Sequence, residues 1–261
     1  MGVKIKARKI EPGPNEVFVA TPNRVYVFPR QVDAFQTAVK FDPANYVLMQ
    51  QGDIENLAAN SAISMIQEYN GSNQEDTIVN VLRDGKFVPT PAQFMPHYRN
   101  VNLAVQGRGV LYDAAGNLIE GERLSQYTHT LNHNNWVWLN ARFPKGEGHL
   151  GLDLVTIAGL NDKGEPVLSR QPLEPCLTED GLADLDSLNS QGLPTQKSKV
   201  NSFEAGKNFY FLHPRQDSAA RVNACAERSL LDCYRSPQYS DSRLGGFPCA
   251  EGACADDKPT K

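Results

Sequence analysis

Four of the five cysteines lie near the C-terminal end, where their spacing could support disulfide, metal or redox chemistry. They are Cys225 and Cys233 in CAERSLLDC, followed by Cys249 and Cys254 in CAEGAC, whereas Cys176 lies far upstream. A zinc site of four thiolates usually contains a closer pair of cysteines, and the C-x-x-C of dithiol enzymes is absent. We therefore expect disulfides, with buried free thiols and a metal site as the alternatives.

The pairing of these cysteines depends on the element that carries the first two. We expect Cys225 and Cys233 on one face of a helix at 217–233. Eight helical residues rise about 12 Å, whereas the Cα atoms of a disulfide lie within roughly 7 Å of each other. The two would therefore pair with Cys249 and Cys254. Such bridges would place the protein outside the cell, in a periplasm or on a virion; without them, a cytoplasmic location is expected.

Five histidines are candidate metal ligands or general bases. His129 and His133 have the H-x3-H spacing that converges on a metal when both lie on one helix. The surrounding THTLNHNNW favours a strand or loop, where residues four apart lie about 13 Å from each other. No glutamate follows His129, as a zinc protease would require. His97, His149 and His213 lack an acidic or thiol partner that the sequence identifies.

Two further sequence patterns partly match known ligand-binding motifs but lack the spacing or the flanking elements that those motifs require. KGEGHLG contains G-x-G-x-x-G within 146–151, but a strand-like run follows, not the helix that meets a pyrophosphate. The acidic run TEDGLADLDSL, with Asp180, Asp184 and Asp186, lacks the spacing and the closing glutamate of a calcium loop. We interpret both as exposed loops and predict no metal site and no cofactor.

Aromatic side chains suggest a different chemistry, the stacking of a sugar ring. Trp136 and Trp138 share one face of the strand expected in NNWVWLNARF, and Tyr127 and Tyr98 are further candidates. A secreted or periplasmic carbohydrate-binding module would hold such rings exposed at its surface. Buried tryptophans would remove the support for this function.

The elements that would position these residues are mainly strands joined by tight turns. Turn residues at 21–23 and 162–164 separate strand-like runs and predict two hairpins. Asp84-Gly85 is a type I′ turn signal for a third hairpin, and a fourth is expected around 116–117. The predicted fold class is α+β, mainly antiparallel β in a sandwich-like or barrel-like arrangement, with two principal helices and an extended C-terminal arm.

Helical spacing and composition divide the chain into three parts. Apolar residues predict one principal helix at 53–69, inside a β-rich core domain that spans 1–175. Ser, Asn, Gln, Gly and Pro accumulate in 176–206, which we interpret as a polar connection. Residues 207–261 are expected to form a strand, the second helix and a cysteine-bearing C-terminal appendage.

The overall composition narrows the classes of function. The net charge of −4 gives no sign of nucleic-acid binding, and no apolar run is long enough to span a membrane. With 40% hydrophobic and 21% charged residues, the chain can form a packed core. The N-terminal MGVKIKARKIEPGP lacks the apolar core of a signal peptide, so either the chain is not exported by that route or a leader has been removed.

The motifs of common enzyme classes are absent, which makes an enzyme the less expected class. The sequence contains no G-x-S-x-G, no H-E-x-x-H and no G-x-x-x-x-G-K-[ST]. We expect a non-enzymatic structural or assembly subunit of a larger particle, such as a virion tail or capsid or a surface or secretion assembly. Its partners would be copies of itself or other protein subunits. The alternatives are the carbohydrate-binding module and a metal-dependent or histidine-using hydrolase.

Overall fold

The computed structural model describes residues 16–21, 24–29, 41–49, 61–225 and 228–251. The chain divides into two compact units, residues 1–38 and 39–261. None of the helices in the described residues has both the length and the apolar character that a membrane crossing requires.

The described residues of the first unit form an antiparallel hairpin. β1 (Glu16–Thr21) pairs with β2 (Arg24–Pro29) over the full length of both strands. These two strands form a sheet of their own. The hairpin predicted around 21–23 is therefore confirmed.

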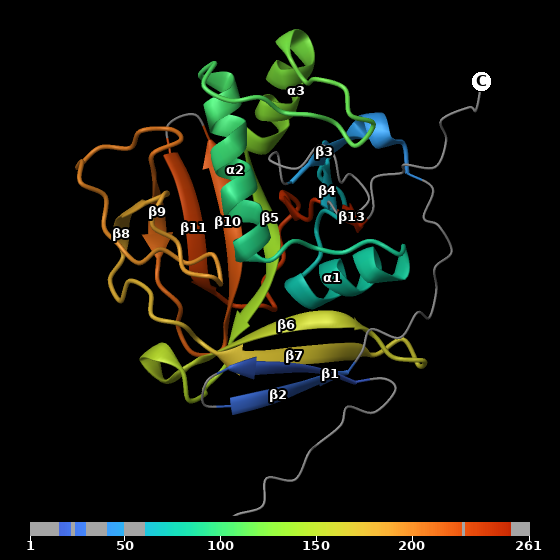
Figure 1. Ribbon diagram of the computed structural model, residues 1–261, viewed down its shortest axis with the longest axis vertical. Helices are drawn as coiled ribbons and strands as arrows, with labels where there is room; N and C mark the ends of the chain where they lie inside the picture. Colours follow the sequence, from blue (N-terminus) through green and yellow to red (C-terminus); the bar gives the residue numbers. More distant parts are fainter. Residues whose placement is uncertain (1–15, 22–23, 30–40, 50–60, 226–227, 252–261) are drawn as a thin grey trace, which may run out of the picture. The chain divides into compact units, whose positions relative to one another are not determined.

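The second unit contains a large open sheet in the order β7-β6-β5-β10-β11-β9-β8 (Figure 1). Neighbouring strands are antiparallel, except that β9 and β11 run parallel. A short strand, β12, also pairs with β5, in parallel. The strands are β5 (His133–Phe143), β6 (Asp153–Leu160), β7 (Pro166–Pro172), β8 (Gly181–Asp184), β9 (Asn208–Leu212), β10 (Ser218–Cys225), β11 (Arg228–Arg235) and β12 (Leu244–Gly245).

A smaller antiparallel sheet has the order β13-β4-β3. Its strands are β3 (Tyr46–Leu48), β4 (Ser61–Ser64) and β13 (Cys249–Glu251). The α+β class with mainly antiparallel strands is thus confirmed. The described sheets are open, so of the predicted sandwich-like or barrel-like arrangement the barrel-like form is not observed.

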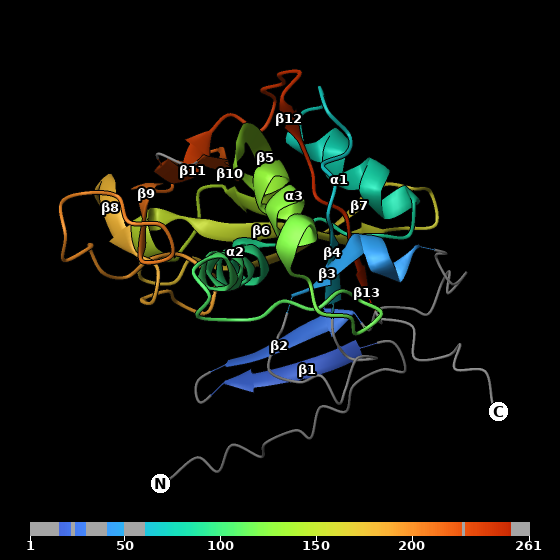
Figure 2. The same ribbon diagram turned by 90° about the horizontal axis from the view of Figure 1, so that it is seen from above.

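Three α-helices occur in the described residues, together with short 3-10 turns at Pro43–Asn45 and His149–Gly151. They are α1 (Gln74–Arg83), α2 (Pro91–Val105) and α3 (Gly121–Asn132). Figure 2 shows α2 and α3 beside each other against β5 and β10. α1 packs on β5 and β6.

The hairpin predicted at Asp84-Gly85 is wrong, because the residues before it form α1. Asn73 caps this helix by accepting a hydrogen bond from the backbone N–H of Asp76 at 2.9 Å. Gly85 follows the last turn with φ +70°, the left-handed conformation that commonly ends a helix. The Asp-Gly pair therefore marks the end of a helix and not a hairpin turn.

The other two predicted hairpins have different outcomes. β6 and β7 form the hairpin predicted around 162–164. The hairpin expected around 116–117 is reduced to a single bridge between Tyr112 and Leu118. The flanking residues belong instead to α2 and α3.

The helix predicted at 53–69 is wrong where the structure describes it. Residues 53–60 lie outside the described residues, and Ser61–Ser64 form β4. β4 is the central strand of the smaller sheet, and both Ala62 and Ile63 are fully buried. A short strand covered on both faces has no alternation, so its apolar run can be mistaken for part of a helix.

The helix predicted at 217–233 is wrong for the same reason. These residues form β10 and β11, which pair antiparallel in the middle of the large sheet. Every residue from Ser218 to Ala224 is buried, so the strand shows no polar face. Because buried residues follow one another without interruption, some of the apolar ones fall by chance at helical spacing, and this spacing suggested a helix. Residues 252–261 of the expected C-terminal arm lie outside the described residues.

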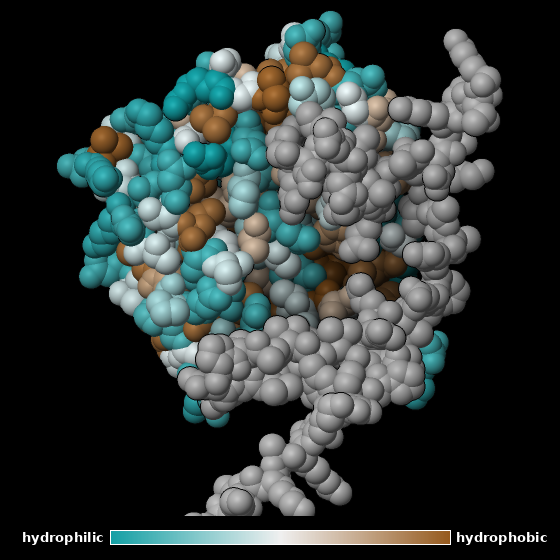
Figure 3. Space-filling view, viewed as in Figure 1, coloured by the Kyte–Doolittle hydropathy of each residue, from teal (hydrophilic) through white to brown (hydrophobic). Residues whose placement is uncertain are grey.

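The segment 176–206 packs into the second unit. It provides β8, and Leu185 and Leu193 belong to the main apolar core. The large sheet thus draws strands from all three parts into which the sequence divides the chain. On the face shown in Figure 3, hydrophilic residues predominate among the coloured residues, with small apolar groups and one larger apolar area toward the centre right.

Candidate functional site

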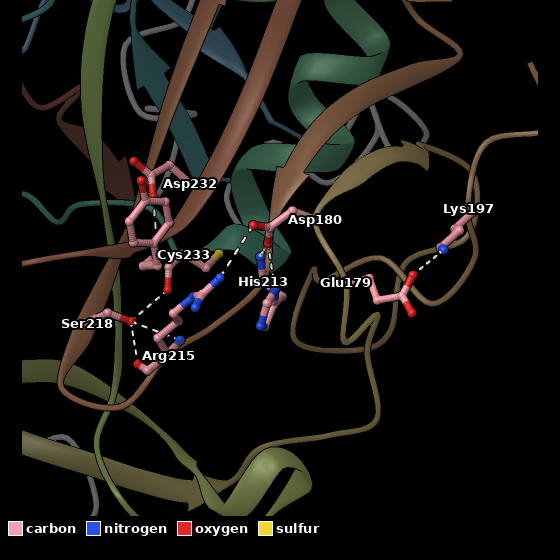
Figure 4. Close-up of polar contacts among 9 residues, drawn as sticks. Glu179, Asp180, Lys197, His213, Arg215, Ser218, Asp232 and Cys233 are labelled. Carbon is pink, nitrogen blue, oxygen red and sulfur yellow. Dashed lines mark hydrogen bonds and ion pairs between the residues drawn. The ribbon is translucent and has the colours of Figure 1, made fainter. Parts of the chain in front are cut away.

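A cluster of polar side chains lies where β8 begins and β9 ends (Figure 4). Asp180 immediately precedes β8, and His213 immediately follows β9. The two strands are antiparallel, with Gly181 opposite Phe211. This pairing brings the residue before one strand close to the residue after the other.

Asp180 holds both the backbone and the ring of His213. Its Oδ1 atom accepts hydrogen bonds from the His213 backbone N–H at 3.0 Å and from the ring Nδ1 at 2.6 Å. Arg215 Nη2 lies 3.4 Å from Oδ2. An ionised carboxylate can only accept hydrogen bonds, so Nδ1 of His213 carries a proton. In the neutral imidazole, Nε2 is then left as an acceptor.

The electrostatics of the cluster keep Asp180 ionised. Burial alone raises the pKa of this carboxyl group, but the hydrogen bonds from His213 and the charge of Arg215 outweigh that effect. The pKa of Asp180 is therefore lowered from its ordinary value. The ionised form is the one that orients the His213 ring.

Arg215 completes the cluster as an exposed cation. Its guanidinium lies over the Tyr234 ring, 5.5 Å from the centroid. The backbone carbonyl of Arg215 lies 2.5 Å from Ser218 Oγ, which is also 2.6 Å from the carbonyl oxygen of Cys233. These contacts position Arg215 beside β11 (Figure 4).

The cluster combines a base with an anion-binding group. A histidine oriented by a carboxylate can act as a general base, and a guanidinium can bind a carboxylate or phosphate. In the part of the chain that the structure describes, no three His, Cys, Asp or Glu side chains are grouped to hold a metal ion.

The remaining histidines lie apart from this cluster. His97 is fully buried, with Nε2 2.6 Å from the hydroxyl of Tyr127. His149 Nε2 lies 3.0 Å from a backbone carbonyl, that of Cys176. His129 lies in α3 and not in the expected strand or loop, whereas His133 begins β5. The two residues of the H-x3-H pattern therefore do not share a helix.

Three cysteines are free thiols in the buried interior, namely Cys176, Cys233 and Cys249. Burial raises the pKa of Cys176 to about 11 and also raises the pKa of the other two thiols. Cys233 in β11 and Cys249 in β13 form no disulfide in the described residues, so the bridges expected for them have no support from the structure. The side chain of Cys225 and all of Cys254 lie outside the described residues, so a bond between them stays a prediction.

The four aromatic candidates are covered by the protein itself. Trp138, Tyr127 and Tyr98 are buried. Trp136 is partly buried, and the Arg221 guanidinium lies over its ring, 3.6 Å from the centroid. Ligand stacking on these rings stays a prediction that requires them to become uncovered.

A buried ion pair, missed by the sequence analysis, accounts for the position of Arg221. Arg221 Nε lies 2.9 Å from Asp232 Oδ2, and each side chain is 3% exposed. The pair links β10 to β11, since Arg221 lies directly opposite Asp232. Tyr239 lies close to both Arg221 and Arg235, at 5.4 and 4.3 Å from its ring centroid. These contacts between aromatic rings and guanidinium groups link the three strands β5, β10 and β11.

Comparisons with known proteins identify no relative. No family model, no curated protein and no solved structure matches this chain. Its function must therefore be argued from the chain itself.

Proposed function

We propose that the protein is a non-enzymatic subunit of a larger assembly, with copies of itself or other protein subunits as partners. The observation that supports this is the N-terminal hairpin β1–β2, which belongs to a compact unit of its own. The Asp180–His213 cluster supports a second candidate, considered below.

The sequence of the hairpin indicates that its apolar residues are covered by another protein surface. Its strands contain VFVA at 17–20 and VYVF at 25–28, with apolar residues at consecutive positions. Such runs are typical of strands that are covered on both faces. An isolated two-stranded hairpin is marginally stable in water and needs a further strand or a packing surface. A neighbouring subunit can supply that surface.

The particle we propose is a virion tail or capsid, or a surface or secretion assembly. The β-rich fold with a separate N-terminal ribbon suits such particles, in which subunits interlock through extended segments. A disulfide that uses Cys225 or Cys254 would place the assembly in an oxidising compartment, whereas free thiols suit the cytoplasm.

The proposal predicts that the full chain elutes as a species larger than the 28.8 kDa monomer. Replacing Phe18→Asp and Val27→Asp, which lie opposite each other in the hairpin, introduces charge into both apolar runs and should yield the monomer. Size-exclusion chromatography with light scattering measures both masses. Glu16→Gln, at the end of β1, is the control and should leave the mass unchanged. A wild-type monomer whose hairpin resists protease would contradict the proposal.

The second candidate function is a histidine-using hydrolase, favoured by the Asp180–His213 hydrogen bond alone. If His213 is a general base, His213→Asn should reduce hydrolysis of p-nitrophenyl esters or phosphates by roughly 10²- to 10⁴-fold. His129→Asn, on α3, is the matched control. An equal rate in the wild type and both variants would rule out this candidate.

A further inference from the structure

Most sheet edges in the second unit are covered by backbone from another segment. Along β8, the Ser198 N–H donates to the carbonyl of Leu182 at 2.9 Å. Along β3, the Leu48 N–H donates to the carbonyl of Tyr112 at 3.0 Å. Along β13, Cys249 exchanges backbone hydrogen bonds with Phe87 at 2.7 and 2.9 Å. These edges therefore cannot accept another strand.

The outer edge of β7 is different. β7 ends the large sheet, and no described residue forms a backbone–backbone hydrogen bond with its outer side. One side chain reaches the end of this edge, where Gln191 Nε2 donates to the carbonyl of Pro172 at 2.9 Å. Leu168, in the middle of the strand, is 59% exposed. An open edge presents unpaired N–H and C=O groups, which makes it a template for an added strand.

The register identifies the groups that face outward. Leu173 N–H donates to the carbonyl of the opposite residue, Leu152, at 3.2 Å, which marks a hydrogen-bonded pair. In an antiparallel ladder such pairs alternate with non-bonded pairs, whose backbone groups point away from the partner strand. Leu168 and Arg170, opposite Ile157 and Val155, fall at the non-bonded positions. Their N–H and C=O groups therefore face the open side.

The prolines of β7 fit this assignment. Pro166 and Pro172, the first and last residues of the strand, also fall on the outward side. Proline has no N–H to offer to an added strand, and proline in a sheet is largely confined to edges. The part of the β7 edge that can pair with an added strand is therefore short and is centred on Leu168 and Arg170.

Building on the assembly function proposed above, we propose that this edge receives one strand of the N-terminal hairpin of a second copy. The hairpin needs a third strand, and β1 and β2 contain six residues each, a length that covers the outward groups of β7. The hairpin and the β7 sheet belong to separate compact units. The segment of residues 30–40, which follows β2, has a maximal extended length of about 36 Å.

Reciprocal exchange closes the assembly at two copies. Each copy has one hairpin and one open β7 edge. In a dimer with a twofold axis, the hairpin of each copy therefore pairs with the β7 edge of the other. The added strand extends the large sheet of each subunit by backbone hydrogen bonds, as in β-strand addition between proteins.

The decisive variant is Leu168→Pro in the full chain. It removes an outward N–H while leaving the hydrogen bonds of β7 with β6 intact, so the dissociation constant of the dimer should rise at least about tenfold. Leu168→Ala keeps the N–H and is the matched control, which should remain dimeric. Light scattering across a dilution series measures the masses, and circular dichroism confirms that both variants are folded.

The outcomes separate this inference from the proposed function. An oligomeric wild type that Leu168→Pro leaves intact overturns the edge contact and retains the assembly function. A monomeric wild type overturns self-assembly itself.

Mixing two variants tests whether the contact forms between copies. Phe18→Asp/Val27→Asp disables the hairpin, Leu168→Pro disables the edge, and each variant alone should be monomeric. Mixed together, they should form a dimer through the one intact hairpin and the one intact edge. If the hairpin instead pairs with β7 of its own chain, mixing produces no dimer, and the proposed exchange is wrong.

Discussion

At the scale of single residues, the protonation of His97 affects the stability of the fold. Its ring is fully buried between α2 and α3, and Nδ1 has no hydrogen-bond partner. Burial lowers the pKa of His97 from 6.5 to about 4. The folded protein therefore retains a neutral imidazole at a pH where the unfolded chain has already bound a proton.

This difference predicts that the free energy of unfolding falls as the pH drops from about 6.5 to 4. In that interval the unfolded state binds more protons than the folded state, so acid favours unfolding. The total loss is about 3 kcal/mol, from 1.36 kcal/mol for each pKa unit. Urea titrations at pH 7 and 4.5 measure the loss, which His97→Gln should diminish and His129→Gln should preserve. An unchanged pH dependence in His97→Gln would show that other groups cause it.

At the scale of elements, β10 and β11 are joined by more than their backbone. Arg221 and Asp232 form an ion pair at 3% exposure, and Arg221 also covers the ring of Trp136. Removing one partner leaves the other as an uncompensated buried charge, which costs more than the pair itself contributes.

Asp232→Ala is therefore expected to lower the free energy of unfolding by about 3–5 kcal/mol. The double variant Arg221→Leu/Asp232→Leu removes both charges and should recover much of this loss. Chemical denaturation of the wild type and these variants, together with Arg221→Leu, gives the coupling between the two positions. If Asp232→Ala costs less than 1 kcal/mol, water compensates the guanidinium and the pair is not a structural tie.

The sequence predicted those elements whose signals are local. Turn residues and apolar runs define β1–β2 and β6–β7, and both hairpins are confirmed. β4 and β10 were mistaken for helices because central strands are buried on both faces and lose the alternation that identifies a strand. α1 was missed because its terminal Gly85 has the same left-handed conformation that hairpin turns require.

The candidate site was beyond sequence reasoning for a different reason. Asp180 and His213 are separated by 33 residues, and no local sequence pattern links them. Their contact depends on the register of β8 against β9, which a single sequence does not specify. A sequence search for an acidic residue just before one predicted strand and a histidine just after another would find such pairs. It would also return many pairs that do not lie together in the fold.

At the scale of the whole molecule, the outward prolines of β7 also limit how the protein can aggregate. Growth of a cross-β fibril requires an uninterrupted row of donors and acceptors that each incoming chain presents again to the next. Pro166 and Pro172 break that row at both ends, and Arg170 places a charge within it. Concentrated solutions of the native protein should consequently stay clear, because the same edge that can accept one short ribbon cannot template a filament.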